Sequence, residues 1–226
     1  MAPAQHAIPF DSRHWDLSRA RVVEHLDRQA ITGTATLRDV VFENGIIEMD
    51  IATVPNTRSY PGILFRKQNP ETYERISIRP HRGTYYDDAL QYAPAFHGAD
   101  SWQLYSGPGK TSALDIPSGE WNHLKIIVSG DRADVYWNDG TTPVLVIGHL
   151  EHGFSQCTVE LMNPQTGSAF YADFSLARTD SPPLQPTASP EPVCGTITSW
   201  ELSSPYPLLK TDLNRYPSPA ILGKLA

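Results

Sequence analysis

Two carboxylates, Glu48 and Asp50, are the first residues of this chain whose types and spacing suit catalysis. They lie in FENGIIEMDIAT, which alternates apolar and polar residues as a half-buried β-strand does. Alternation puts both carboxylates on one face and Ile47, Met49 and Ile51 on the opposite, core-facing side. The two Cα atoms would lie about 7 Å apart, near enough for the ~5–5.5 Å carboxyl separation of a retaining glycosidase. The strand is therefore a candidate catalytic element.

A denser group of aromatic and polar side chains follows in the next sixty residues or so. Aromatic rings stack on the apolar C–H faces of sugars, while amide, guanidinium and imidazole groups bond hydroxyls. Alternation in the strand ISIR puts Ile76 and Ile78 on one face and Ser77 and Arg79 on the other, so Arg79 projects away from the core. We therefore expect noncovalent binding of a carbohydrate or carbohydrate-like small molecule. The predicted ligand-binding residues are Arg66, Arg79, His81, Gln91, Tyr92, His97, Trp102, Gln103 and Tyr105.

Other interpretations of the same residues stay open. In a purely structural one, Trp102 and Tyr92 fill the core, while Arg66 and Arg79 pair with acidic neighbours such as Asp88. In an enzymatic one, acid/base chemistry would use a histidine, whose ordinary pKa near 6.5 suits neutral pH. The candidates for that role are His81 and His97, and the candidate catalytic set is His81, Glu48 and Asp50. A third interpretation is a protein-interaction module with a flat exposed surface.

The sequence predicts no metal site of recognisable spacing. His149 and His152 lie three residues apart, which suits a helix, but their segment GHLEHG reads as a loop. Calcium at the rim of the fold stays open as an expectation, with oxygen ligands from Asp87, Asp88 or Asp100. No other cofactor is expected.

The elements that must position these residues are β-strands. From Val22 to about Leu176 the dominant period is two, with β-branched and aromatic residues and frequent turn residues, which predicts an all-β sandwich or barrel. The candidate strands are 21–25, 30–37, 46–53, 62–67, 73–79, 89–95, 101–105, 121–129, 133–138, 143–148, 157–161 and 169–177. The clearest local unit is a hairpin, in which NDG at 138–140 offers a tight turn between two alternating runs.

Composition changes abruptly after the predicted strands. Residues 179–192 contain five prolines and predict an extended linker, which divides the chain into a domain at 1–178, the linker, and a tail at 193–226. The tail is too short to fold alone, although it could pack back on the sandwich. Whether Cys157 pairs with Cys194 stays open.

The overall charge limits the classes of partner. A net charge of −7 does not suit a nucleic-acid or anionic-membrane surface, and a neutral or cationic partner is easier to accommodate. No stretch is apolar for long enough to span a membrane. The first residues lack the charged and apolar regions of a signal peptide, which slightly favours the cytoplasm. The oligomeric state cannot be inferred.

Four stretches together resemble the concanavalin A-like lectin/glucanase superfamily: FENGIIEMDI, GILFRKQNPETYERISIRPH, ALQYAPAFHGADSWQLYSGPG and GEWNHLKIIVSGDRADVYWND. More narrowly they are similar to bacterial laminin-G-like domains near the 3-keto-disaccharide hydrolase group, known as domain of unknown function 1080. The resemblance covers roughly residues 20 to 178. It implies a jelly-roll of two antiparallel sheets, one of them concave, with ligands on the concave face or its rim.

The same resemblance bears on the opening strand. Family 16 glycosidases on this fold carry a strand with the pattern Glu-x-Asp-x-(x)-Glu, whose first Glu is the nucleophile and whose last is the acid/base. Glu48 and Asp50 match the first two positions, but Ala52 or Thr53 stands where the last carboxylate is needed. The resemblance thus implies a scaffold of this kind without the acid/base residue of that family.

Overall fold

The computed structural model describes residues 7–100, 102–138, 140–153, 157–180 and 182–186. The chain divides into two units, 1–186 and 187–226, and the second unit lies wholly outside the described residues, as does the predicted tail. The first unit is almost entirely antiparallel β-structure, which confirms the predicted all-β jelly-roll sandwich. Among the described residues, no helix has the length and apolar character needed to cross a bilayer.

The described residues of this unit form fourteen strands and two short 3-10 helices. The strands are β1 (Trp15–His25), β2 (Arg28–Leu37), β3 (Gly45–Thr53), β4 (Gly62–Asn69), β5 (Thr72–Ile78), β6 (Leu90–Tyr92), β7 (Ala95–Phe96), β8 (Ala99–Asp100), β9 (Thr111–Ser112), β10 (Trp121–Ser129), β11 (Arg132–Trp137), β12 (Leu145–Ile147), β13 (Thr158–Met162) and β14 (Ala169–Arg178). The 3-10 helices are η1 (Gly83–Tyr85) and η2 (Trp102–Leu104).

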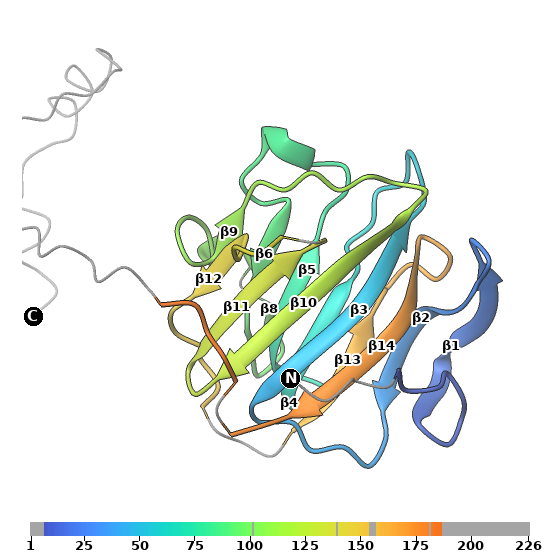
Figure 1. Ribbon diagram of the computed structural model, residues 1–226, viewed down its shortest axis with the longest axis horizontal. Coiled ribbons are helices and arrows are strands. Elements are labelled where there is room, and N and C mark those ends of the chain that lie inside the picture. The colour runs from blue at the N-terminus through green and yellow to red at the C-terminus, as the bar shows by residue number, and fades with distance from the viewer. Residues whose placement is uncertain (1–6, 101, 139, 154–156, 181, 187–226) are drawn as a thin grey trace, which may run out of the picture. The chain divides into compact units, whose positions relative to one another are not determined.

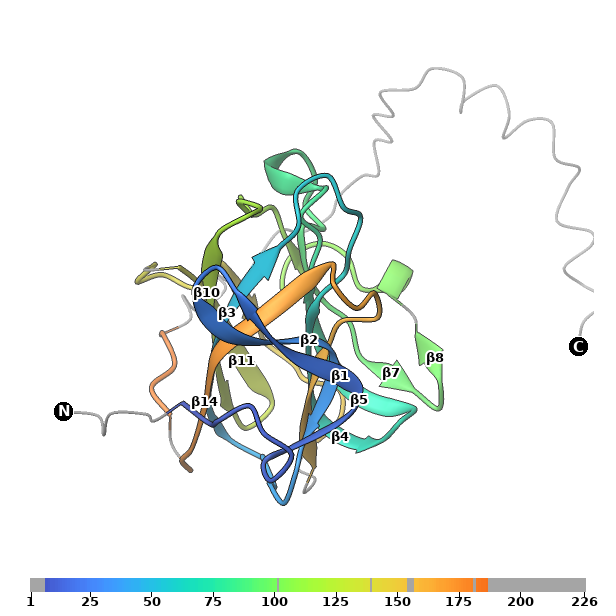
Figure 2. The ribbon, with the colours of Figure 1, turned by 90° about the vertical axis from the view of Figure 1, so that its right-hand side faces the viewer.

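The strands pair in the order β12-β11-β10-β3-β14-β2-β13-β4-β5-β6-β9, with β1 on the outside of β2. Strands β14 and β2 are joined through one Cα pair, Tyr171 with Ile31, so the sheet curls there and folds back on itself. Figure 1 shows β11, β10, β3 and β14 side by side in one layer, and Figure 2 shows β4 and β5 in the other. The curl produces a sandwich with one interior.

The core lies between the two layers. Ile47, Met49 and Ile51 of β3 are fully buried in it, as their alternation predicts, and they share one apolar cluster with Ile76 and Ile78 of β5. The apolar face of β3 and the apolar face of β5, which the sequence predicts to be buried, therefore pack in the same core. The opposite face of β5 carries Ser77 and is continued by Arg79 just after the strand, and both residues line a cavity.

The predicted hairpin is present, but its turn is longer than the two-residue type. Strands β11 and β12 pair antiparallel with Val135 opposite Leu145, and the connection runs from 138 to 144, with position 139 outside the described residues. Leu145 and Ile147 are the β12 residues buried in the core.

The structure differs from the sequence prediction in several segments, among them β1, which begins at Trp15 and not at 21. The stretch predicted as a strand at 101–105 instead contains the 3-10 turn η2, which exposes Trp102. The first part of the predicted linker also makes defined contacts: the Gln185 amide donates to the Asp134 carboxylate over 2.9 Å, and Arg132 donates to the Gln185 carbonyl over 2.6 Å. Proline prevents strand pairing there, but not anchoring by the flanking backbone.

Strand β4 contains a bulge that changes which side chains face the interior. The pairing of β4 with β5 is regular through Phe65 opposite Glu74 and then shifts, and Arg66 has a positive φ of 46°. The extra residue turns Arg66 inward, where its guanidinium donates to the Glu43 carbonyl over 3.1 Å and to the Gly130 carbonyl. Lys67 consequently takes the outward face.

Candidate functional site

A cavity of about 440 Å³ lies on the outward face of β5, and the predicted site residues Arg79 and Trp102 are among those that line it. Arg75 and Ser77 of β5, and Arg79 directly after the end of that strand, alternate along the chain and form the floor of the cavity. We call this cavity the arginine pocket. Its lining residues are Arg58, Tyr60, Arg75, Ser77, Arg79, Arg82, Asp100, Trp102, Met162 and Pro164.

Arg79 is the most firmly held of the pocket's cations. Its Nη1 donates to the Asp88 carbonyl over 2.9 Å and to the Asp88 carboxylate over 3.0 Å, and its Nη2 donates to the Gln91 side-chain oxygen. Burial lowers the pKa of Arg79 below its ordinary value, and the Asp88 carboxylate partly opposes that shift. A guanidinium so fixed presents its remaining donors in a defined direction.

Two aromatic rings flank this guanidinium. The Arg79 guanidinium carbon lies 5.1 Å from the centre of the Trp102 ring and 5.8 Å from the centre of the Tyr60 ring, both within cation–π range. Trp102 is 38% exposed and Tyr60 is 37% exposed, so both rings also present surface to solvent. The pocket therefore combines a charged floor with aromatic walls.

Gln91 supports the site from below. Besides accepting from Arg79, it donates from Nε2 to the Trp102 carbonyl over 2.8 Å and to the Tyr105 carbonyl over 2.6 Å. One buried amide thus orients the cation and holds the turn that carries the Trp102 ring. Gln91 acts as a positioning residue.

A tight hairpin places the pocket's own carboxylate. Strands β7 and β8 are joined by His97 and Gly98, whose φ values of 48° and 80° fit a type I′ turn. The hairpin ends in Asp100, which accepts two bonds of 2.6 Å from the Arg75 guanidinium. His97, a predicted ligand-binding residue, is therefore a turn residue, and it is not among the pocket's lining residues.

His81 lies beside the pocket, with its ring edge-on to Tyr60 at a centroid distance of 5.4 Å. Partial burial lowers the pKa of His81 from 6.5, and the positive charges of Arg58, Arg82 and Arg79 lower it further. The imidazole is thus neutral at neutral pH, which suits a hydrogen-bonding group or a base.

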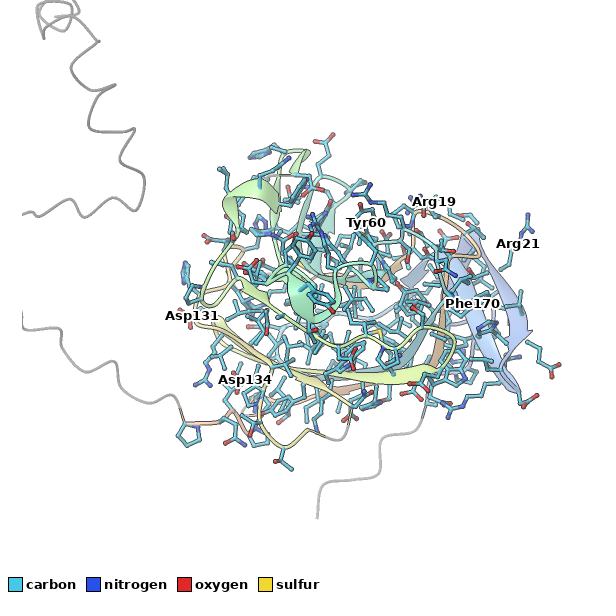
Figure 3. The ribbon with its side chains drawn as sticks, turned by 90° about the horizontal axis from the view of Figure 1, so that it is seen from above. Arg19, Arg21, Tyr60, Asp131, Asp134 and Phe170 are labelled. Carbon is cyan, nitrogen blue, oxygen red and sulfur yellow. The ribbon has the colours of Figure 1, made fainter. Side chains whose placement is uncertain are left out.

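A second cavity, of about 610 Å³, adjoins the first and shares Met162 and Pro164 with it. We call it the outer pocket. It contains Arg19, Lys67 and Glu160, and the Glu160 carboxylate accepts from Lys67 and, over 3.2 Å, from Arg19. Figure 3 shows Tyr60 of the arginine pocket and Arg19 of the outer pocket along one side of the molecule, with Asp134 of β11 toward the other.

Of the predicted ligand-binding residues, Arg79 and Trp102 line the arginine pocket, Gln91 supports it and His81 adjoins it. Tyr92 lies in the core, where its hydroxyl donates to Glu74 over 2.7 Å. Arg66 is buried beside the backbone that it binds, as described above. The Tyr105 ring packs edge-on against Tyr92, and Gln103 is exposed outside the lining set.

Glu48 and Asp50 lie in the other layer, on the outward face of β3. Asp50 accepts a bond of 2.7 Å from His123 of β10 and is also paired with Arg28, while Lys125 lies 3.2 Å from Glu48. Neither carboxylate lines the arginine pocket or the outer pocket. The structure therefore does not bring them together with His81.

The described residues contain no group of three or more His, Cys, Asp or Glu side chains that could hold a metal ion. Asp88 and Asp100, two of the oxygen ligands considered for calcium, are ion-paired with Arg79 and Arg75. In the GHLEHG loop, His152 is buried and its Nε2 lies 2.8 Å from the Ala95 carbonyl oxygen. Calcium at the rim stays a prediction.

Several residues that line the arginine pocket were not predicted from the sequence, among them Arg58, Tyr60, Arg75 and Arg82. Arg75 could have been predicted, because the alternation that places Ser77 and Arg79 on the outward face also places Arg75 there. Arg58 and Tyr60 come from the loop before β4, and Arg82 from the loop after β5. Their approach depends on long-range pairing of the strands, which local periodicity does not encode.

No family model matches the sequence, and no curated protein matches it either. Solved structures do match in fold. A carbohydrate-binding module of Bacillus subtilis is 16% identical with a TM-score of 0.50, covering 74% of this chain and 96% of that one. At this identity the likeness establishes the fold alone.

Two further solved structures match less closely. The galectin LEC-6 of Caenorhabditis elegans is 12% identical with a TM-score of 0.46, covering 72% of this chain and 99% of that one. A β-glucanase of Bacillus licheniformis is 10% identical with a TM-score of 0.46, covering 77% and 97% respectively. The antiparallel β-sandwich agrees with the fold of the first match. The resemblance to the concanavalin A-like superfamily, and the closer one to laminin-G-like and 3-keto-disaccharide hydrolase domains, stay predictions.

Proposed function

We propose that this protein binds a saccharide noncovalently in the arginine pocket. The observation that carries the proposal is Arg79, fixed by Asp88 and Gln91 and flanked by Trp102 and Tyr60, at the floor of a cavity of about 440 Å³. A volume in this range is typical of small-molecule sites. Guanidinium donors for hydroxyls beside exposed ring surface are the chemistry that sugars require.

The shared fold adds support of a general kind. The solved structure with a TM-score of 0.50 bears the name of a carbohydrate-binding module, and jelly-rolls host many unrelated functions. The inference therefore rests on the pocket's side chains. A protein-interaction module would favour a flat surface, whereas two adjoining cavities favour a small or extended glycan ligand.

The test is a calorimetric titration across a broad glycan panel, with and without calcium. We expect at least one saccharide to bind, and an Arg79→Ala/Trp102→Ala variant to lose about 10-fold to 100-fold in affinity, since charged hydrogen bonds contribute about 1.5–3 kcal/mol. The matched control is Trp121→Ala, because Trp121 carries an equivalent contact with Arg28 at 5.4 Å in the other layer. Absence of binding across the panel, or equal affinity in the double variant, would overturn the proposal.

An enzyme that uses His81 is the second candidate, favoured by its lowered pKa beside the pocket. It would show turnover of a bound glycoside that His81→Ala abolishes while folding and binding persist. If product forms no faster with the wild-type protein than in buffer alone, this candidate is excluded.

A further inference from the structure

The charge of the two pockets is opposite in sign to that of the whole protein. Six cationic side chains and two carboxylates line the arginine and outer pockets, and including Asp88 still leaves three net positive charges. The chain as a whole carries a net charge of −7. The cations are Arg19, Arg58, Lys67, Arg75, Arg79 and Arg82, which are six of its 18 lysines and arginines.

The ion pairs within the two pockets do not neutralise this positive charge. Asp100 is bound by both arms of Arg75, and Asp88 is shared, since it lies 3.0 Å from Arg79 and 3.5 Å from Arg82. Arg58 is exposed, lines the pocket and forms no ion pair with any residue that the structure describes. Arg79 and Arg82 share one carboxylate, and Arg58 has none among the described residues. Positive charge therefore remains to interact with a ligand in the cavity.

The same arginines also act on His81 beside the pocket. Its pKa is lowered chiefly by burial, and the next causes are the positive charges of Arg58, Arg82 and Arg79, with Asp88 acting in the opposite direction. A titratable group beside the pocket therefore experiences net positive potential. A fixed, planar guanidinium at the floor favours oxyanions, which it binds in a fork.

On this basis we propose that the ligand is an acidic saccharide, whose carboxylate or sulfate group is bound by Arg79 and Arg58 while its ring lies against Trp102 and Tyr60. This inference rests on the proposed saccharide-binding function and specifies the substrate class of the same pocket. The chain's overall negative charge repels the parts of a long polyanion that extend beyond the arginine and outer pockets. A short acidic oligosaccharide therefore fits better than a nucleic acid.

The experiment compares charged and uncharged versions of the same rings. Trigalacturonate is titrated against its methyl ester, and a 6-sulfated N-acetylglucosamine disaccharide against the unsulfated one, at 0.1 M and 1 M salt. We expect one charged member to bind about tenfold or more tightly than its uncharged partner, because each charge-assisted bond contributes at least that factor. The preference should shrink as the Debye length falls from about 10 Å to about 3 Å.

Variants separate the charge effect from a loss of folding. Arg58→Ala, at an exposed position without an ion pair among described residues, should lower the charged-to-uncharged affinity ratio more than it lowers affinity for the uncharged ligand. Arg21→Ala, an exposed arginine of β1 outside both pockets, is the control and should leave the ratio unchanged. The bound acid should also raise the pKa of His81, as measured by NMR.

Each outcome decides between the two proposals. A tighter carboxylate assigns a uronic acid, and a tighter sulfate assigns a sulfated sugar. Equal affinity for charged and uncharged partners overturns the acidic ligand but leaves saccharide binding intact. Failure of every probe, together with failure of the broad neutral panel, overturns both.

Discussion

The guanidinium of Arg79 lies 5.1 Å from the centre of the Trp102 ring, and Gln91 bonds both the guanidinium and the backbone of Trp102. The charge and the ring are therefore held in one geometry by a single buried amide. Contacts of this kind preorganise a site, because little side-chain freedom is left to lose on binding.

Replacing Arg79 by lysine tests whether the planar fork matters as well as the charge. Arg79→Lys keeps the positive charge but cannot bond Asp88 and Gln91 together in the same plane, so we expect affinity for the ligand to fall by at least about tenfold. Calorimetry measures the change. Arg28→Lys, beside Trp121 in the other layer, is the control, and an Arg79→Lys protein with wild-type affinity would contradict the expectation.

Replacing Gln91 by leucine should loosen the site without touching its surface. The change removes an acceptor for Arg79 and the donors to the Trp102 and Tyr105 carbonyls, which should lower the free energy of unfolding by about 1–3 kcal/mol. Urea unfolding measures the loss, and acrylamide quenching of Trp102 should increase. The exposed Gln103→Leu should change stability by less than about 0.5 kcal/mol, and an equal effect of both changes would refute the role of Gln91.

The hydroxyl of Tyr92 should matter for stability because it is buried against a carboxylate. It donates to Glu74 over 2.7 Å and accepts from the Glu151 amide over 3.1 Å, and Glu74 also accepts from the His152 amide. Tyr92→Phe should therefore cost about 1–3 kcal/mol of unfolding free energy. Tyr85→Phe, at a residue that is 92% exposed, is the control and should have no measurable effect. Equal unfolding curves for the two variants would refute this role of the hydroxyl.

The pair of His123 and Asp50 should make stability depend on pH. The hydrogen bond that His123 donates to Asp50 raises the pKa of His123 above 6.5, and this effect is larger than the lowering by burial. Protonated His123 therefore stabilises the fold fully below about pH 6.5, and this contribution is lost as pH rises through the higher folded pKa.

The difference in unfolding free energy between wild type and His123→Gln isolates that contribution. It should shrink between pH 6 and pH 8, by less than about 1 kcal/mol because the side chain is 40% exposed. NMR titration should give a His123 pKa above 6.5 that falls in Asp50→Asn. An unchanged pKa in that variant would mean that Asp50 is not the cause.

Alternation along single strands was sufficient to predict the core and one face of the site. Ile76 and Ile78 point inward and Arg79 outward, because a strand of period two leaves no other arrangement once one face is buried. Tyr92 could not be assigned in the same way, because a tyrosine satisfies a core position when its hydroxyl finds a partner, and that partner, Glu74, comes from another strand.

The carboxylates Glu48 and Asp50 illustrate a second limit. Their outward direction followed from the sequence, but the layer on which they lie depends on which strands pair, and β3 pairs with β10 and β14. The spacing of the two carboxylates therefore predicts that they lie on a surface, but it does not predict how far that surface is from His81. Arg66 is the third case, since nothing local marks the bulge that turns it inward.

That bulge lets β4 carry two neighbouring cations on opposite sides of the sheet. Because the strand holds one residue more than uninterrupted alternation needs, deleting Arg66 would leave Phe65 facing the interior and Lys67 facing outward. Lys67 would keep its bond to Glu160, whereas the Glu43 and Gly130 carbonyls would lose the guanidinium that donates to them. A change in the length of β4 at this point would therefore spare the outer pocket and fall on the buried backbone that Arg66 binds.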